Sequence, residues 1–473
     1  MISISGSKSK TKLNYYFIGL KGVGMTMLAQ FLVKTGNRVS GSDIKDVFLT
    51  DSVLQQSKIK VLSPFNPKNI PLSSKKGLAK VEVIVHSSAF TPENNVELAY
   101  IKNNPARFKN IKILSYAEAL GGIFNSYYGL AVCGSHGKTT TAAWLAYVLW
   151  RAGFEPNVLV GSSVPQFKNQ SSLVGASKYL VAEVDEYQNK LKYFAPQGVI
   201  LNNIEYDHPD FFKTEASYVK VFADFIRKVP ASGFLVANGA DKYIQKIKNN
   251  CRGTLITYSL RQVQDIKTKN GLTSFTFGRL GEFKIRLLGA HNILNALAVI
   301  KTALRLKVPL AQIKKYLAEF KGTARRAQIL GKYQEALIID DYAHHPTEVK
   351  ATLEALRAVY PKRNIITVFH PHTYTRTKAL FKDFVTSFKD TDELIILNIY
   401  GSAREKQGGV SSQELVTAIN TFNKKQKRDQ SIKNLADLKA ATKYLRQRLG
   451  KNDLLILMGA GEVFRVGENL LRK

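Results

Sequence analysis

The sequence predicts an α/β protein with three tandem domains, each an alternation of strands and helices. Short apolar runs alternate with stretches of helical periodicity along the chain, which is typical of βαβ units. The chain has 473 residues, 45% of them hydrophobic, and is too long for one ordinary domain. Glycine-rich or charged stretches follow the apolar runs, at the edge where a parallel sheet binds its ligands.

The first predicted domain, residues 1–128, opens with a strand at 15–18, a glycine-rich turn and a helix, followed by a strand at 38–40 and then Asp43. Such a βαβ unit, expected to be Rossmann-like, can hold a diphosphate at the helix N-terminus. The turn reads G-x-x-G-x-G, so it does not indicate a dinucleotide, and glycines that only pack are an equal alternative. Another strand, 81–86, ends in two serines. The candidate substrate-binding residues here are Gly19, Gly22, Val23, Gly24, Asp43, Ser87 and Ser88.

The second predicted domain, residues 129–321, begins with an apolar strand, a small-residue loop and a helix, the order of a phosphate loop. Lys138 can reach the outer phosphates of a nucleotide, and the Thr139 hydroxyl can ligate Mg²⁺. The loop is two residues shorter than G-x-x-x-x-G-K-[ST]. A glycine turn that only caps a core helix is the less favoured alternative. The candidate nucleotide-binding residues are Gly134, Ser135, His136, Gly137, Lys138, Thr139 and Thr140.

Polar residues follow the next two apolar strands of this domain. The strand at 179–182 leads to Glu183, and the strand at 198–201 leads to Asn203 and His208. We predict that these strands are adjacent and deliver Glu183 and His208 toward the phosphate loop, where they form a metal site with Thr139. A surface carboxylate and a helix-capping histidine are the alternative, which is weaker because three features converge.

The third predicted domain, residues 322–473, starts near Arg325 and Arg326 and contains strands at 336–339, 364–369, 393–398 and 453–458. The first of these strands leads into Asp-Asp-Tyr-Ala-His-His-Pro, and the second into His-Pro-His-Thr-Tyr-Thr-Arg. Because the charged clusters again follow strand ends, we expect the functional site to lie between domains.

Composition restricts the class of protein. The net charge of +33 raises the possibility of a basic phosphate-loop NTPase that acts on nucleic acid. That alternative does not account for the Glu183 and His208 pair, and the basic residues are spread along the chain, so we expect no nucleic-acid partner. Two cysteines, the absence of a long apolar run and a polar N-terminus predict a cytoplasmic protein without a membrane segment.

Taken together, the motifs resemble those of the Mur ligases, ATP-dependent amide-forming enzymes of peptidoglycan precursor synthesis. The resemblance covers nearly the whole chain, and the shortened phosphate loop is the form found in this family. It rests on the stretches 19–25, 134–141, 183–186, 203–208, 291–292, 340–348, 371–377 and 459–461.

The resemblance implies a UDP-sugar-binding Rossmann-like domain, a central ATP-binding domain and a C-terminal Rossmann-like domain that brings the amino acid. With ATP and Mg²⁺, such an enzyme converts the carboxylate of UDP-N-acetylmuramate to an acyl phosphate, which the amine of L-alanine attacks. By the same resemblance, Lys138, Glu183, His208 and His344 are catalytic; His291, Asn292, Arg326 and Asp341 contact ATP; and Asn203, His344, His372 and Arg376 contact the substrates.

Several alternatives stay open at this stage. The family usually has an aromatic and an acidic residue where Ala327 and Gln328 stand, so the nucleotide contacts of that loop are in question. The stretches at 183–187 and 201–206 also resemble a recycling ligase that attaches a preformed tripeptide to the same UDP-sugar. Folate and cyanophycin ligases are a weaker alternative because they generally lack the N-terminal glycine turn. We expect a monomer or a homodimer.

Overall fold

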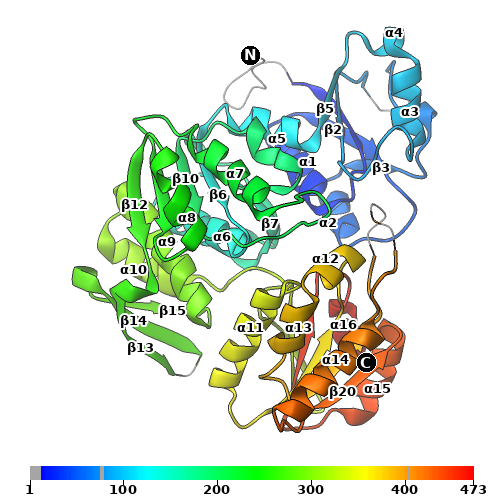
Figure 1. Ribbon diagram of the computed structural model, residues 1–473. Helices are drawn as coiled ribbons and strands as arrows, with labels where there is room; N and C mark the ends of the chain where they lie inside the picture. The colour runs from blue at the N-terminus through cyan, green and yellow to red at the C-terminus, as the bar shows by residue number, and fades with distance from the viewer. Residues whose placement is uncertain (1–11, 75–78, 270, 402–404, 406, 473) are drawn as a thin grey trace.

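The computed structural model describes residues 12–74, 79–269, 271–401, 405 and 407–472, and it confirms three α/β domains in tandem (Figure 1). The polar N-terminal segment, which we predict not to be a secretory signal, lies mostly outside the described residues. Each domain contacts the other two through side chains. Lys34 of the first domain donates to Ser172 O of the second, and Arg465 of the third donates to Val47 O of the first.

The first domain contains a five-stranded sheet in the order β3-β2-β1-β4-β5, with every neighbouring pair parallel. Its last helix begins at a capping box in which Ser115 and Glu118 satisfy each other's backbone N–H groups. The elements are β1 (Asn14–Ile18), α1 (Val23–Lys34), β2 (Arg38–Ser42), α2 (Thr50–Gln56), β3 (Lys60–Leu62), β4 (Val83–His86), α3 (Val96–Asn103), α4 (Pro105–Phe108), β5 (Lys112–Ser115) and α5 (Tyr116–Phe124).

The second domain contains a seven-stranded sheet in the order β12-β11-β10-β6-β9-β7-β8, and only β8 runs antiparallel to its neighbour. The strand β6, which leads into the phosphate loop, is therefore central. Its strands and helices are β6 (Tyr128–Cys133), α6 (Lys138–Arg151), β7 (Asn157–Val164), β8 (Gln170–Leu173), β9 (Tyr179–Glu183), β10 (Gly198–Leu201), α7 (Glu215–Ile226), β11 (Phe234–Asn238), α8 (Lys242–Ile247), β12 (Thr254–Tyr258), α9 (Ala290–Arg305) and α10 (Leu310–Glu319).

One expectation about this sheet is wrong. The strands that lead to Glu183 and His208 are β9 and β10, and they are not neighbours, because β6 lies between them. Consecutive strands of a parallel sheet need not pair, since each crossover passes over a face of the sheet. The two residues therefore approach the phosphate loop from opposite sides.

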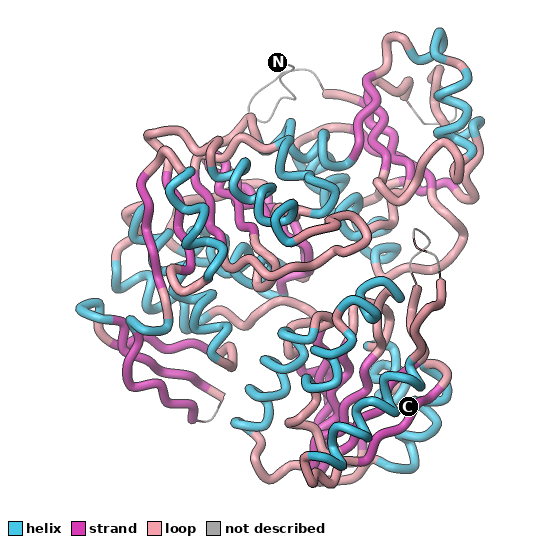
Figure 2. Tube along the Cα trace, in the orientation of Figure 1, coloured by secondary structure: helices cyan, strands magenta, loops and turns pink. Residues whose placement is uncertain are grey.

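A three-stranded antiparallel sheet interrupts the second domain where the sequence indicates continued α/β alternation. Its strands are β13 (Val263–Lys269), β14 (Leu272–Phe277) and β15 (Glu282–Ile285), and Figure 2 shows them as a separate group at the edge of the domain. Alternate residues of β14 are buried, and Phe275 stacks on Phe283 with ring centroids 5.8 Å apart. This two-residue period is the pattern of a half-buried strand.

The third domain contains a six-stranded sheet in the order β16-β17-β21-β18-β19-β20, in which β16 is antiparallel and the other pairs are parallel. Residues 342–346 and 370–376 follow β17 and β18, two interior strands whose carboxyl ends lie on the same side of the sheet. Its elements are β16 (Gln328–Tyr333), β17 (Ala336–Asp341), α11 (Pro346–Val359), β18 (Asn364–Phe369), α12 (Tyr374–Ala379), α13 (Phe381–Ser387), β19 (Glu393–Leu397), α14 (Ser412–Lys425), β20 (Ser431–Leu435), α15 (Leu438–Arg448), β21 (Asp453–Met458) and α16 (Phe464–Leu471).

The helix α6, which follows the phosphate loop, is held by burial on all sides. Every residue from Thr139 to Leu149 is buried, and Trp144 is stacked on Phe320 with ring centroids 5.3 Å apart. A helix that is apolar around its whole circumference belongs inside a domain. The start of this helix is therefore fixed relative to the central sheet.

Two further observations concern the environment of the protein. Among the described residues, no helix combines the length and the apolar character needed to cross a membrane. Cys133 is buried and Cys251 is half-buried, and both are free thiols.

The burial of Trp144 in α6 predicts that removal of its side chain destabilises the protein. Trp144→Ala should lower the free energy of unfolding by about 3 to 5 kcal/mol, because a fully buried aromatic side chain leaves a cavity. Trp150→Ala on the same helix is the matched control, since Trp150 is 44% exposed and should cost clearly less. Denaturant unfolding followed by circular dichroism measures both, and equal losses would contradict the assigned packing.

Candidate active site

The phosphate loop lies so close to the end of β10 and to α9 that two of its positions favour glycine. Gly134 and Gly137 have φ angles of +126° and +77°. A Cβ atom would lie 2.7 Å from Asn203 O at the first position and 2.5 Å from Asn295 Oδ1 at the second. The Asn203 side chain accepts from His136 N at 2.8 Å and donates to His136 O at 3.1 Å. The loop is therefore fixed by contacts with its own domain before any ligand binds.

Lys138 folds back across the loop. Its Nζ donates to Gly134 O at 2.6 Å and to Ser135 O at 3.0 Å, and it lies 3.5 Å from Glu186 Oε2. Burial opposes the charge of this lysine, but Glu186 and further carboxylates nearby raise its pKa above the usual value. The ammonium group is therefore charged and lies over the loop, where an outer phosphate of a nucleotide would sit.

Thr139 and Glu183 meet at the N-terminal end of α6. Thr139 Oγ1 donates to Glu183 Oε1 at 2.9 Å, and Gly161 N donates to Glu183 Oε2 at 2.7 Å. A hydroxyl and a carboxylate are the oxygen ligands that Mg²⁺ prefers. The donor set at this point fits a magnesium ion.

The third predicted metal ligand, His208, has different neighbours. Its Nε2 lies 3.8 Å from Glu186 Oε1 and 3.8 Å from Asp207 Oδ2, and its φ angle is +57°. The ring packs against Tyr187, with centroids 4.6 Å apart. The structure thus brings Thr139 and Glu183 into direct contact and sets His208 beside a separate pair of carboxylates.

A cavity of about 310 Å³ joins the first domain to the second. It is lined by the glycine-rich turn, by the serines that follow β4 and by Glu183, so it connects the predicted sugar side with the predicted metal side. Asp43 is absent from its lining; this carboxylate accepts from Lys21 N at 2.6 Å and from Ile44 N at 2.8 Å, and so fixes the turn itself. Gly19 starts the turn with a φ angle of +83°. The predicted residues that line the cavity are Gly22, Val23, Gly24, Ser87, Ser88 and Glu183.

Asp341 organises the loop at the start of the third domain. Its carboxylate accepts from Ala327 N at 2.7 Å and from Ala343 N at 2.8 Å, and burial raises its pKa to about 6. The departure from the family at position 327 therefore leaves this contact intact, because the contact uses only the backbone N–H. Gln328 likewise has a local role, since its Oε1 accepts from Arg325 N at 2.9 Å.

Arg326, His291 and Asn292 lie where the second and third domains meet. Arg326 Nη1 is 3.6 Å from Glu348 Oε1. Burial, reinforced by the nearby Arg326 charge, lowers the pKa of His291 to about 4. Asn292 Nδ2 donates to Leu288 O at 2.8 Å and lies 3.1 Å from His291 Nε2. The neutral imidazole and the amide form a polar surface at the start of α9.

His344 is a neutral imidazole held by its own loop. Its Nδ1 lies 2.9 Å from Tyr342 O, so this nitrogen carries the hydrogen and Nε2 is left as an acceptor. Burial lowers the pKa of His344 to about 3. The ring centroid of His344 lies 6.4 Å from that of His372, which joins the two histidine-containing stretches of the third domain.

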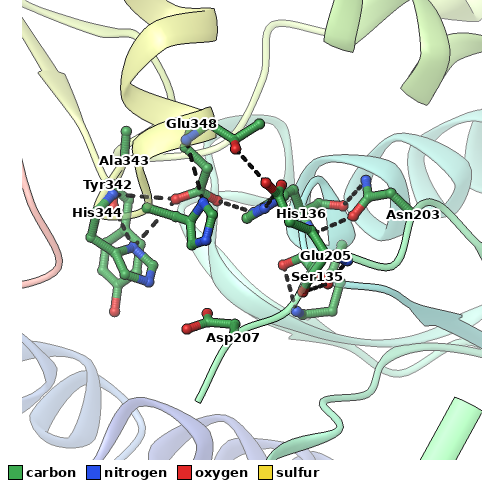
Figure 3. A network of polar contacts seen from close by, with 12 residues as sticks. Ser135, His136, Asn203, Glu205, Asp207, Tyr342, Ala343, His344 and Glu348 are labelled. Atoms are coloured by element: carbon green, nitrogen blue, oxygen red, sulfur yellow. Dashed lines mark hydrogen bonds and ion pairs between the residues drawn. The ribbon is translucent and has the colours of Figure 1, made fainter. Parts of the chain in front are cut away.

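His136 of the phosphate loop forms an ion pair across the domain boundary, as Figure 3 shows. Its Nε2 lies 2.9 Å from Glu205 Oε2 in its own domain, and its Nδ1 lies 3.2 Å from Glu348 Oε1 in the third domain. Burial opposes protonation, but hydrogen bonds to these two carboxylates raise the pKa of His136 to about 9. Glu205 Oε1 also accepts from Thr347 Oγ1 at 2.6 Å, a second contact between these domains.

Arg376 forms the other ion pair across this boundary. Its Nε lies 3.1 Å from Asp207 Oδ1, and its Nη2 lies 3.3 Å from Asp207 Oδ2. Both side chains are less than 10% exposed. The arginine predicted to hold the amino acid is therefore already paired with a carboxylate of the second domain.

The sequence motifs assign no role to several residues of this junction. Each stands inside a stretch that was recognised, but its partner lies far away in the chain, so spacing gave no signal. The one local signal is the four-residue step from His344, just before α11, to Glu348 in its first turn, where the two side chains lie 3.4 Å apart. The unassigned residues are Glu186, Glu205, Asp207, Thr347 and Glu348.

Comparisons with known proteins agree along the whole chain. Three family descriptions match: "Mur ligase family, catalytic domain" over residues 14–128, "Mur ligase middle domain" over 132–303 and "Mur ligase, glutamate ligase domain" over 325–461. UDP-N-acetylmuramate--L-alanine ligases of Desulfitobacterium hafniense and Clostridium acetobutylicum are each 36% identical to this chain. The first match covers 97% of this chain and 99% of the relative, and the second covers 98% and 99%.

Solved structures show the same three-domain fold. The UDP-N-acetylmuramate-alanine ligase of Thermotoga maritima superimposes with a TM-score of 0.80 at 21% identity, covering 97% of this chain and 98% of that one. The murein peptide ligase of Psychrobacter arcticus gives 0.71 at 20% identity, with the same coverage.

The fold and the site define a three-domain α/β protein with a phosphate loop at a junction of domains. The matches over nearly the full length specify the class further. The chain belongs to the Mur ligase family.

The raised pKa of His136 predicts how the contribution of this residue to stability depends on pH. A raised folded-state pKa means that the contribution of His136 to stability is complete below about pH 6.5 and is lost as the pH rises through about 9. The difference in thermal unfolding midpoint between wild type and His136→Gln should therefore shrink across that window. His86→Gln is the control, because burial lowers the pKa of His86 and its difference should stay constant there. A constant difference for His136→Gln would contradict the charged state.

Proposed function

We propose that this protein joins L-alanine to the carboxylate of UDP-N-acetylmuramate, with consumption of ATP, in cytoplasmic peptidoglycan precursor synthesis. The observation that carries the proposal is the similarity of nearly the whole chain to relatives that bear this name, at 36% identity in the first two cases. The site supports it, because the domain of the phosphate loop shares a cavity with the first domain and the ion pair Asp207–Arg376 with the third.

The chemistry follows from the reactants. A carboxylate is a poor electrophile and hydroxide is a poor leaving group, so phosphorylation of the carboxylate supplies both missing properties. The nitrogen of the amino acid then forms the amide bond while the bond to phosphate breaks. Backbone N–H groups of the loop orient the polyphosphate, and Lys138 compensates the charge that develops on the transferred group.

Thr139 and Glu183 would hold Mg²⁺, because their oxygens already meet at 2.9 Å. A bound Mg²⁺ supplies charge neutralisation for the phosphoryl group. We extend the proposed metal site to His208, which lies beside Glu186 and Asp207 and follows β10 on the other side of β6. Asn203 and the cavity-lining residues of the first domain would hold the sugar side.

Residues of the third domain would receive the amino acid. Arg376 suits its α-carboxylate because a planar guanidinium pairs with two oxygens. The acceptor nitrogen of neutral His344 would orient the amine. His291, Asn292, Arg326 and Asp341 would border the nucleotide, and the protein would act as a monomer or a homodimer.

Phosphate release from ATP tests the proposal directly. Wild-type protein should release phosphate with UDP-N-acetylmuramate and L-alanine together, and not with single-stranded nucleic acid. Preference for the L-alanyl-γ-D-glutamyl-diamino acid tripeptide over L-alanine would instead establish the recycling reaction.

Lys138→Ala should lose about 10²-fold or more in rate, while UDP-sugar binding by calorimetry stays near normal. Wild-type turnover in this variant would refute the role of the loop.

A magnesium titration tests the metal site. Glu183→Gln should require more Mg²⁺ for half-maximal activity, because an amide binds the ion more weakly than a carboxylate does. His208→Ala should shift the titration in the same direction. Asp224→Asn is the control, since the ion-pair partners of Asp224 within the described residues are the exposed side chains of Lys220 and Arg227. Titrations of both site variants that superimpose on wild type would refute the two-sided metal site.

A further inference from the structure

The pairing of Arg376 with Asp207 uses one edge of the guanidinium and leaves the other open. Nε and Nη2 face the two carboxylate oxygens, and Nη1 lies 3.4 Å from His372 Nδ1. A guanidinium has five N–H groups, so two of them have no acceptor among the described residues. Donors that are this buried require partners. The open edge of Arg376, next to His372, is therefore suited to a ligand with acceptor oxygens.

The position of this pair determines where in the molecule the ligand would lie. Arg376 belongs to α12 of the third domain, whereas Asp207 follows β10 of the second. Asp207 also accepts from His208 N at 2.7 Å. The His208 ring lies 3.8 Å from Glu186, which in turn lies 3.5 Å from Lys138 of the phosphate loop. A ligand on the open edge of Arg376 would thus lie at the junction that contains the phosphate loop.

We propose that Asp207 is a positioning residue for the incoming amino acid. It holds Arg376 by one edge, so that the opposite edge and His372 receive the α-carboxylate. This inference rests on the proposed function and adds a residue to it. Asp207 does not touch the amino acid; it acts through Arg376, by fixing the direction in which the guanidinium points.

The physical reason is the length and flexibility of an arginine side chain. A free guanidinium samples many orientations, and a carboxylate bound to it would carry the amine along. With Asp207 in place, the same cation has one orientation, while the separate contacts His136–Glu348 and Thr347–Glu205 hold the third domain over the loop. Misplacement by about 1 Å is enough to reduce a rate about 10²-fold, so the restraint has a measurable effect.

Asp207→Asn is the test variant, because it keeps the size of the side chain but removes its charge and one acceptor. It should lower kcat/KM for L-alanine by about 10- to 10²-fold. KM for ATP, KM for the UDP-sugar and the Mg²⁺ requirement should stay as in wild type. We expect L-alaninamide, which lacks the carboxylate, to react slowly with wild type and at the same rate with the variant.

The ratio of kcat/KM for L-alanine to that for L-alaninamide is the decisive quantity, since it does not depend on how much of the variant is folded. We expect this ratio to fall in Asp207→Asn and to stay constant in the control Asp224→Asn. Arg376→Lys should lower it as well, and adding Asp207→Asn to Arg376→Lys should change it little, because both act through one cation.

Two results would overturn the inference: an unchanged ratio in Asp207→Asn, with or without a shift in the Mg²⁺ requirement, or additive effects in the double variant. These results are distinct from failure of the proposed function. Wild-type protein that does not ligate L-alanine would overturn the proposed function, before any variant is compared. Wild-type activity with an unchanged ratio would overturn the role of Asp207 alone.

Discussion

The site depends on one constraint: a charge taken out of water needs a partner. His136, Glu348, Arg376 and Asp207 are all largely removed from solvent, and each has a partner in another domain. The ion pairs His136–Glu348 and Arg376–Asp207 therefore form only when the third domain is in contact with the second. This requirement fixes the relative position of the domains and, with it, the shape of the junction.

The sequence could predict the elements that local patterns define. The strand β6, the phosphate loop and α6 were all recognisable, because glycines, a lysine and a threonine stand at fixed offsets within one short stretch. The order of strands in the sheet was not recognisable, since pairing depends on crossovers that leave no local pattern. The small sheet at residues 263–285 was missed because three short strands interrupt an otherwise regular alternation.

The residues of the candidate site also fall into two groups, those whose partners are near in the sequence and those whose partners are far away. Residues such as Lys138 and Thr139 have their contacts within or near the loop, and motif spacing was sufficient to find them. Asp207 and Glu348 form contacts with residues that lie 169 and 212 positions away in the sequence, and no spacing rule can find such partners. Asp43 shows the opposite case: a position typical of a ligand contact is occupied by a carboxylate that fixes the backbone of its own turn.

Position 327 illustrates how a departure from a family pattern can leave one contact of a loop unaffected. Only the main chain of Ala327 meets Asp341, at a φ angle of +48°, so the identity of the side chain is left free within the residues that tolerate this conformation. What the contact with Asp341 requires at this position is a backbone shape and not a chemical group. Substitutions can therefore accumulate there over evolutionary time without altering the contact, and descent leaves a weaker trace in the sequence than in the fold.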